Sequence, residues 1–221
     1  MWIEDPLEKR VLESPGCGNL PLVGRELVKS SPSTLNEIAA YQLGSSLGLP
    51  LPRARYFFTE KPLQIDGCAW PVGTPVLLTE DISPTTHCHS VISAPCCSHD
   101  KAKYLAFFTL NRDVEWPEIH ISESGIYLLD LEFQFAIFPS SEIDTDAVLF
   151  EYAKQSESAI RYSLEMANNC GLIPEYWEFM KEMVASCRDF SPDFGRSSMD
   201  KISLFVKKSI ELRLDVIAQL L

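Results

Sequence analysis

The chain has 221 residues, of which 46% are hydrophobic and 23% charged, so it is too apolar for a disordered protein and long enough to bury a core. Its 19 Lys and Arg residues against 31 Asp and Glu residues give a formal net charge of −12 at pH 7. A field this negative repels phosphate backbones and anionic lipids, which argues against direct nucleic-acid and membrane partners.

The chain start and the cysteines indicate a compartment. Residues 1–6 show neither the basic region nor the apolar region of a secretory signal, and the seven cysteines are an odd number. We therefore expect reduced thiols and a cytoplasmic protein.

The first part of the chain predicts short strands. Residues 11–12 and 20–23 flank a Pro-Gly-Cys-Gly turn, which is typical of a hairpin. A short strand is predicted at Glu26–Lys29, and two more at residues 55–59 and 75–79, which are β-branched or apolar and bounded by Pro or Gly.

One amphipathic helix is predicted between these strands. Thr34 and Glu37 have the Thr-x-x-Glu spacing of a capping box. Apolar residues then recur at helical spacing, at Leu35, Ala39, Leu43 and Leu47. Gly48 is a natural residue to end the helix, because glycine adopts the left-handed conformation without strain.

The chain after residue 80 is predicted to be mainly helical. Residues 81–100 read as a loop or connection, residues 101–110 as a helix, and residues 119–122 with 126–130 as a hairpin. The last third is helical by its apolar spacing. The fold class is therefore α+β with two lobes: a small β-rich N-lobe with one helix at residues 1–80, and a mainly helical C-lobe at residues 81–221. Two such lobes would leave a ligand cleft between them.

Five polar residues have the types and the order that phosphoryl transfer from ATP requires. Lys29 ends a strand, and Glu37 follows in the first turn of a helix, where it can hold an ammonium group. Asp113 lies in an irregular segment, Glu118 follows it closely, and Asp130 ends an apolar strand. Such a set supplies a cation for the phosphates, a carboxylate for the acceptor hydroxyl and acidic ligands for a metal ion.

Four of these five residues also have a simpler interpretation. Glu37 is explained by the capping box alone, and Lys29 by an ordinary strand end exposed to water. Asp113 would equally stabilise a turn, and Glu118 would equally be a solvated side chain. A carboxylate at Asp130, directly after an apolar strand, is costly unless it is paired or bound to a metal ion.

In combination these motifs resemble those of a known family. Val28-Lys29, then Leu35-Asn36-Glu37-Ile38-Ala39-Ala40, then Leu47-Gly48-Leu49-Pro50-Leu51-Pro52 resemble the N-lobe of HipA-like kinases. Asn111-Arg112-Asp113 and Tyr127-Leu128-Leu129-Asp130 resemble their catalytic loop and metal-binding strand, and Ile173-Pro174-Glu175-Tyr176-Trp177 a phrase of the shorter members' C-terminal helices. The resemblance spans roughly residues 23–190 and implies a protein-kinase-like fold.

The resemblance implies a role for each matching position. Lys29 would contact the phosphates of ATP, with Glu37 as its partner; Asp113 would be the catalytic carboxylate; Asp130, with Glu118, would bind Mg²⁺. Leu78 and Glu80 would belong to the hinge that receives adenine, and Gly18 to the loop that covers the phosphates. The implied activity is transfer of the γ-phosphate of ATP to a hydroxyl, with a protein as substrate.

Departures from the family pattern define the alternative. A basic residue and a histidine usually follow the catalytic aspartate, where this chain has Val114 and Glu115, and the second metal ligand is usually asparagine, where it has Glu118. These substitutions favour a kinase-like module that binds a nucleotide or a partner protein without catalysis.

A separate cluster gives a third hypothesis. Six Cys and His residues lie between positions 87 and 99, which is enough for a tetrahedral zinc site. Their spacing matches no standard zinc finger, so an incidental loop composition remains the alternative.

Overall fold

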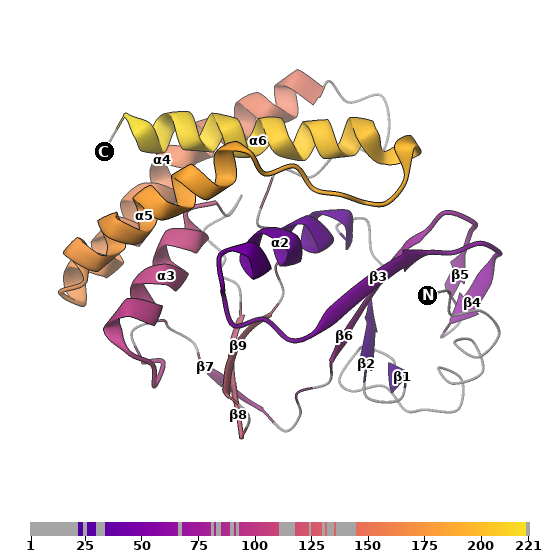
Figure 1. The fold of residues 1–221 in the computed structure, drawn as a ribbon, viewed down its shortest axis with the longest axis horizontal. Helices are drawn as coiled ribbons and strands as arrows, with labels where there is room; N and C mark the ends of the chain where they lie inside the picture. The colour runs from indigo at the N-terminus through magenta and orange to yellow at the C-terminus, as the bar shows by residue number, and fades with distance from the viewer. Residues whose placement is uncertain are drawn as a thin grey trace.

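The computed structural model describes residues 22–23, 26–29, 34–65, 68–80, 82, 85–88, 91, 93–110, 118–123, 125–129, 131, 135 and 145–219. Within these ranges the protein is an α+β structure: small antiparallel sheets with one N-terminal helix, followed by a mainly helical part with four helices (Figure 1).

The N-terminal sheet is antiparallel and has the strand order β1-β2-β6-β3. Its strands are β1 (Leu22–Val23), β2 (Glu26–Lys29), β3 (Ala54–Phe58) and β6 (Pro75–Glu80). β6 is central in this order, and its residues Val76, Leu77 and Leu78 are almost completely buried. A strand covered in this way reads as a continuous apolar run rather than an alternating one, as the sequence Pro-Val-Leu-Leu does. A two-stranded ribbon, β4 (Leu63–Ile65) with β5 (Cys68–Trp70), lies between β3 and β6 in the chain.

The helix α2 (Thr34–Ser46) connects β2 to β3 and is buried along most of its length. Gly44 leaves room for Leu51 and Phe107 to pack closely on α2. A Cβ atom at this position would lie 2.9 Å from Leu51 Cδ1 and 3.6 Å from Phe107 Cζ. Gly48 follows the helix with φ of +65°, the left-handed conformation that glycine adopts most easily. The helix therefore contacts its own sheet and the C-terminal part together.

The C-terminal part is built from α3 (Ser98–Phe108), α4 (Thr145–Asn169), α5 (Ile173–Arg188) and α6 (Asp200–Ala218), with the short 3₁₀ turn η2 (Ser197–Met199) before α6. A three-stranded sheet of β7 (Thr86–Cys88), β8 (Glu118–Ser122) and β9 (Gly125–Leu129) accompanies them. α3 packs on α5, and α4 packs on α6.

One buried apolar cluster runs through both parts of the chain. It includes Ile38 of α2 and Leu77 of β6 as well as Phe107 of α3 and Phe179 of α5. A backbone hydrogen bond of 2.9 Å from Leu128 N–H to the Pro50 carbonyl also joins β9 to the segment after α2. The division at residue 80 stays a prediction, and these contacts hold the two predicted lobes together.

Most predicted elements are confirmed to within a few residues: the strands at 26–29, 55–59 and 75–79, the helix from Thr34, the hairpin of β8 with β9, and the helical C-terminal third. The interpretation of residues 81–100 as a loop was wrong in part, since β7 lies inside this range and α3 begins at Ser98. β7 has no apolar pattern and forms because it pairs with β8. The ribbon of β4 and β5 was not predicted, and residues 11–12 and 20–21 of the predicted first hairpin lie outside the described residues.

Candidate functional site

The backbone brings the positions of the predicted lysine and glutamate to the same region of the N-terminal part. Lys29 is the last residue of β2 and lies opposite Leu77 in the antiparallel register. Leu77, which is 1% exposed, belongs with Ile38 of α2 to one buried cluster, and α2 packs on β6. Glu37 is in the first turn of α2 and is only 3% exposed. A carboxylate at this depth needs a cation or several hydrogen-bond donors to stay ionised.

One of the two predicted metal-binding positions, Glu118, lies at one end of a hairpin. Glu118 is the first residue of β8 and lies opposite Leu129, the last residue of β9. Asp130 follows Leu129 directly in the chain but is itself outside the described residues. The register therefore places Glu118 directly across the hairpin from Leu129, the residue before Asp130.

Four other predicted site residues remain, two outside the described residues and two in β6. Asp113 and Gly18 lie outside the described residues. Leu78 is fully buried in the centre of β6, so its side chain is committed to the core, whereas Glu80 ends that strand and is exposed. The Glu80 N–H donates a hydrogen bond of 2.8 Å to the Arg53 carbonyl, which ties the end of β6 to the start of β3.

Three residues of the cysteine and histidine cluster lie in secondary structure: His87 and Cys88 in β7, and His99 in α3. His87 of β7 lies opposite His120 of β8, and their rings stack with centroids 5.3 Å apart. Cys97 precedes α3, and its Sγ donates to Asp100 Oδ2 at 3.1 Å. Among the side chains that the structure describes, no three Cys, His, Asp or Glu residues are close enough together to hold a metal ion. His89 of this cluster lies outside the described residues, and the zinc hypothesis stays a prediction.

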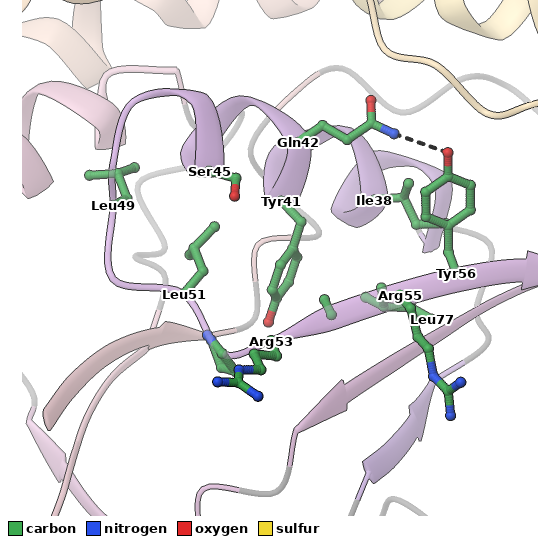
Figure 2. A pocket seen from close by; sticks show the side chains of 12 residues that line it. Ile38, Tyr41, Gln42, Ser45, Leu49, Leu51, Arg53, Arg55, Tyr56 and Leu77 are labelled. Atoms are coloured by element: carbon green, nitrogen blue, oxygen red, sulfur yellow. Dashed lines mark hydrogen bonds between the residues drawn. The ribbon is translucent and has the colours of Figure 1, made fainter. Parts of the chain in front are cut away.

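A pocket of about 620 Å³ lies between α2 and β3 (Figure 2). Ile38, Leu51 and Leu77 form part of its lining, and the side chain of Tyr41, which also lines it, points from α2 toward Arg53 in the close-up. Its volume is within the range of small-molecule sites. Of the predicted site residues whose side chains the structure describes, Glu37, Leu78 and Glu80, none lines it, although Leu77, which lies opposite Lys29, does.

The edge of this pocket is formed by two side chains that bind the segment between α5 and α6. Gln42 Nε2 and the Tyr56 hydroxyl both donate to the carbonyl oxygen of Asp193, each at 2.5 Å. The Asp193 N–H donates back to Gln42 Oε1 at 2.9 Å, and Gln42 Nε2 is also 3.3 Å from the Tyr56 hydroxyl, the contact dashed in Figure 2. The sequence contains no motif for this contact, because its partners are more than 130 residues apart and one partner is backbone.

A buried arginine stabilises the end of α3. Arg213 of α6 is 0% exposed, and its Nη1 donates to the Thr109 carbonyl at 3.0 Å. Its guanidinium lies 4.3 Å from the ring centroid of Tyr152, whose hydroxyl donates to the Leu110 carbonyl at 2.7 Å. Thr109 and Leu110 directly precede the segment that contains Asp113. The apolar spacing of the last third predicted its helices but gave no sign of this buried arginine.

Burial also raises the pKa of several acidic groups. It raises the pKa of the Cys187 thiol from 9.0 to about 12, and it raises the pKa of the Tyr104, Tyr152 and Tyr176 hydroxyls above 10.0. The folded protein therefore keeps protons that the unfolded chain releases first. The stabilisation is fully present below about pH 9 and is lost as the pH rises toward 12.

We therefore expect the free energy of unfolding to fall between pH 8 and pH 10.5, with about 2 kcal/mol of the loss due to Cys187 alone. Urea unfolding at the two pH values measures this loss. Cys187→Ala should have a smaller pH dependence than the wild type, since it removes one of the groups that titrate. Equal stability of the wild type at both pH values would contradict the assignment.

The described residues contain no helix that is long and apolar enough to cross a membrane. The described residues place the position of Lys29, at the end of a strand, and Glu37, buried in the first turn of a helix, in the same part of the fold. Residues of these two types are parts of a site for a phosphorylated ligand. Comparisons of the chain with protein-family models, with curated proteins and with solved structures found no match.

Proposed function

We propose that the protein is an ATP-dependent phosphotransferase of the kind that HipA-like kinases represent, with the hydroxyl of a protein as the phosphate acceptor. The nucleotide would bind beside the N-terminal sheet and the start of α2, and the end of the β8–β9 hairpin would supply the metal ligands. The observation that carries this proposal is Glu37, a carboxylate 3% exposed in the first turn of a helix that packs against the strand next to Lys29.

The strand register supports a Lys29–Glu37 pair. Lys29 lies opposite Leu77, which belongs to the cluster under α2. Directly opposed residues of an antiparallel pair share a face of the sheet, so this is the register that such a pair requires. In protein kinases a strand lysine held by a helix glutamate contacts the phosphates of ATP. The ammonium of Lys29 would then stabilise the charge that develops on the phosphates.

The acidic positions supply the rest of the chemistry. The carboxylate of Asp113 would orient the acceptor hydroxyl and take its proton as the acceptor oxygen bonds to the γ-phosphorus. The bond between the γ-phosphorus and the bridging oxygen breaks in the same step, and ADP leaves. Oxygen ligands of this type suit Mg²⁺, and the register that places Glu118 opposite Leu129, next to Asp130, fits such a pair of ligands. When bound, Mg²⁺ would neutralise charge between the phosphates.

The proposal is tested with the purified full-length chain, labelled ATP and Mg²⁺. We expect label on the protein itself or on an added protein acceptor, and an increase of the melting temperature with ATP. At a hundredfold excess of ATP over its dissociation constant the stabilisation is about 2.7 kcal/mol. A chain that is neither stabilised by ATP with Mg²⁺ nor labelled would overturn the proposal.

Glu37→Gln separates the proposed ion pair from the capping box. Glutamine satisfies a capping box as well as glutamate does, so a purely structural Glu37 predicts little change. If the charge holds Lys29 against the phosphates, the rate of labelling falls by about 10²–10³-fold while the fold is retained. Labelling rates and circular dichroism of the two proteins measure both effects. A labelling rate equal to that of the wild type would leave the capping role only.

A second candidate function is favoured by one specific observation. Val114, Glu115 and Glu118 stand where the family pattern has a basic residue, a histidine and an asparagine. A glutamate there adds negative charge beside the phosphates and would slow transfer. A module that binds ATP without catalysis therefore predicts stabilisation by ATP with no label transferred, and the experiment above distinguishes the two.

A further inference from the structure

The connector between α5 and α6, residues 189–196, is bound to the N-terminal part at several points. In Figure 1 this connector passes beside α2 before it turns back into α6. Its backbone at Asp193 exchanges three hydrogen bonds with Gln42 of α2 and Tyr56 of β3. Phe194, which is 2% exposed, anchors the same segment in the main apolar cluster.

A further contact extends the attachment along β3. The guanidinium of Arg196 lies 4.6 Å from the ring centroid of Phe58, the last residue of that strand. Gly195 provides the turn between the two contacts: it has φ of +66°, and its N–H donates to Asp193 Oδ1 at 2.7 Å. The connector therefore binds α2 and β3 together through its backbone and one side chain.

The other end of α2 is held separately. Asn36 Nδ2 donates to the carbonyl of Phe135 at 2.8 Å, so the first turn has its own link to the C-terminal part of the chain. Gln42 lies five residues after Glu37 on the same short helix. The two attachments, one at each end, leave α2 little freedom to rotate or shift relative to the C-terminal helices.

We propose that the α5–α6 connector is a strap that sets the position of α2, and that Gln42 and Tyr56 are positioning residues for Glu37. This inference rests on the proposed function, since it gives Glu37 a role beside the phosphates. Neither residue touches the nucleotide. Their effect on transfer passes through the orientation of the helix, because a displaced Glu37 would no longer hold the ammonium of Lys29 against the phosphates, and such misplacement costs rate.

The test compares Gln42→Ala and Tyr56→Phe with Ser45→Ala as the matched control. Ser45 is an exposed residue on the same helix, three positions after Gln42, and also lines the pocket. Tyr56→Phe removes only the hydroxyl that donates to Asp193 and keeps the ring. We expect both strap variants to show faster amide hydrogen exchange in the peptide that covers residues 34–46, and Ser45→Ala to match the wild type.

The second measurement is steady-state labelling with ATP. We expect kcat to fall by about tenfold in the strap variants, with the KM for ATP changed less than kcat, since the lost contact acts on the transition state and not on the binding of adenine. A variant with unchanged exchange in α2, or with faster exchange and an unchanged kcat, would overturn the proposal. If the wild type does not transfer phosphate, the proposed function fails by itself, and the exchange experiment still decides whether the connector holds α2.

Discussion

Asp113→Ala and Asp130→Ala are each expected to abolish phosphate transfer while the protein stays folded. Asp113→Ala removes the carboxylate that takes the proton of the acceptor hydroxyl, which contributes about 10²–10⁴-fold to the rate. Asp130 would lose a ligand of the Mg²⁺ that neutralises the phosphates, with a comparable or larger effect. Labelled ATP with each purified variant measures the rate.

The two variants differ in a second property. Asp113→Ala should keep the stabilisation by ATP with Mg²⁺, because the carboxylate of Asp113 acts on the acceptor hydroxyl and does not hold the nucleotide. Asp130→Ala should lose much of this stabilisation, because it removes a ligand of the metal ion. Asp215→Ala is the matched control, since Asp215 is an exposed aspartate of α6 far along the chain from the predicted site. Transfer at the wild-type rate in either site variant would exclude the role assigned to that residue.

Arg213→Ala is expected to lower the free energy of unfolding by about 3–5 kcal/mol. The side chain is 0% exposed, donates to the Thr109 carbonyl at 3.0 Å and packs on Tyr152. Truncation leaves a cavity and a buried carbonyl that has lost a donor, and both effects are costly. Urea or thermal unfolding of the purified variant measures the loss.

Two further variants show which property of Arg213 matters. Arg213→Met fills much of the volume without the donors, so it should lose less stability than Arg213→Ala, with the remainder due to the hydrogen bonds. Arg161→Ala removes an arginine from an exposed pair with Glu157, whose side chains are 75% and 69% exposed, and should cost less than about 1 kcal/mol. Equal losses for Arg213→Ala and Arg161→Ala would contradict the buried role of Arg213.

The parts of the fold that the sequence predicted well are those whose signals are local. The Thr-x-x-Glu pattern from Thr34, the glycine after α2 and the apolar run of β6 each predicted an element from neighbouring residues alone. β7 was missed because its Thr-His-Cys sequence has no strand pattern and forms only when β8 pairs with it. Tertiary pairing outweighs local propensity at such a strand.

The candidate site likewise contains a residue that local sequence predicted and contacts that it could not predict. Glu37 was selected from its spacing after Lys29, and its depth of burial gives that choice physical weight. The contact of Gln42 and Tyr56 with Asp193 could not be predicted from the sequence, because the acceptor is a backbone carbonyl, which any residue type carries. Arg213 was hidden for a related reason: an arginine among apolar residues of a helix is usually taken as a surface position.

The most direct test of the nucleotide site is a crystal structure of the full chain with Mg²⁺ and a non-hydrolysable ATP analogue. We expect the phosphates to lie beside the ammonium of Lys29, with the carboxylate of Glu37 in contact with that ammonium and Asp130 bound to the metal ion. An analogue bound elsewhere, or Lys29, Asp113 and Asp130 on separate surfaces of the molecule, would contradict the proposed kinase-like function.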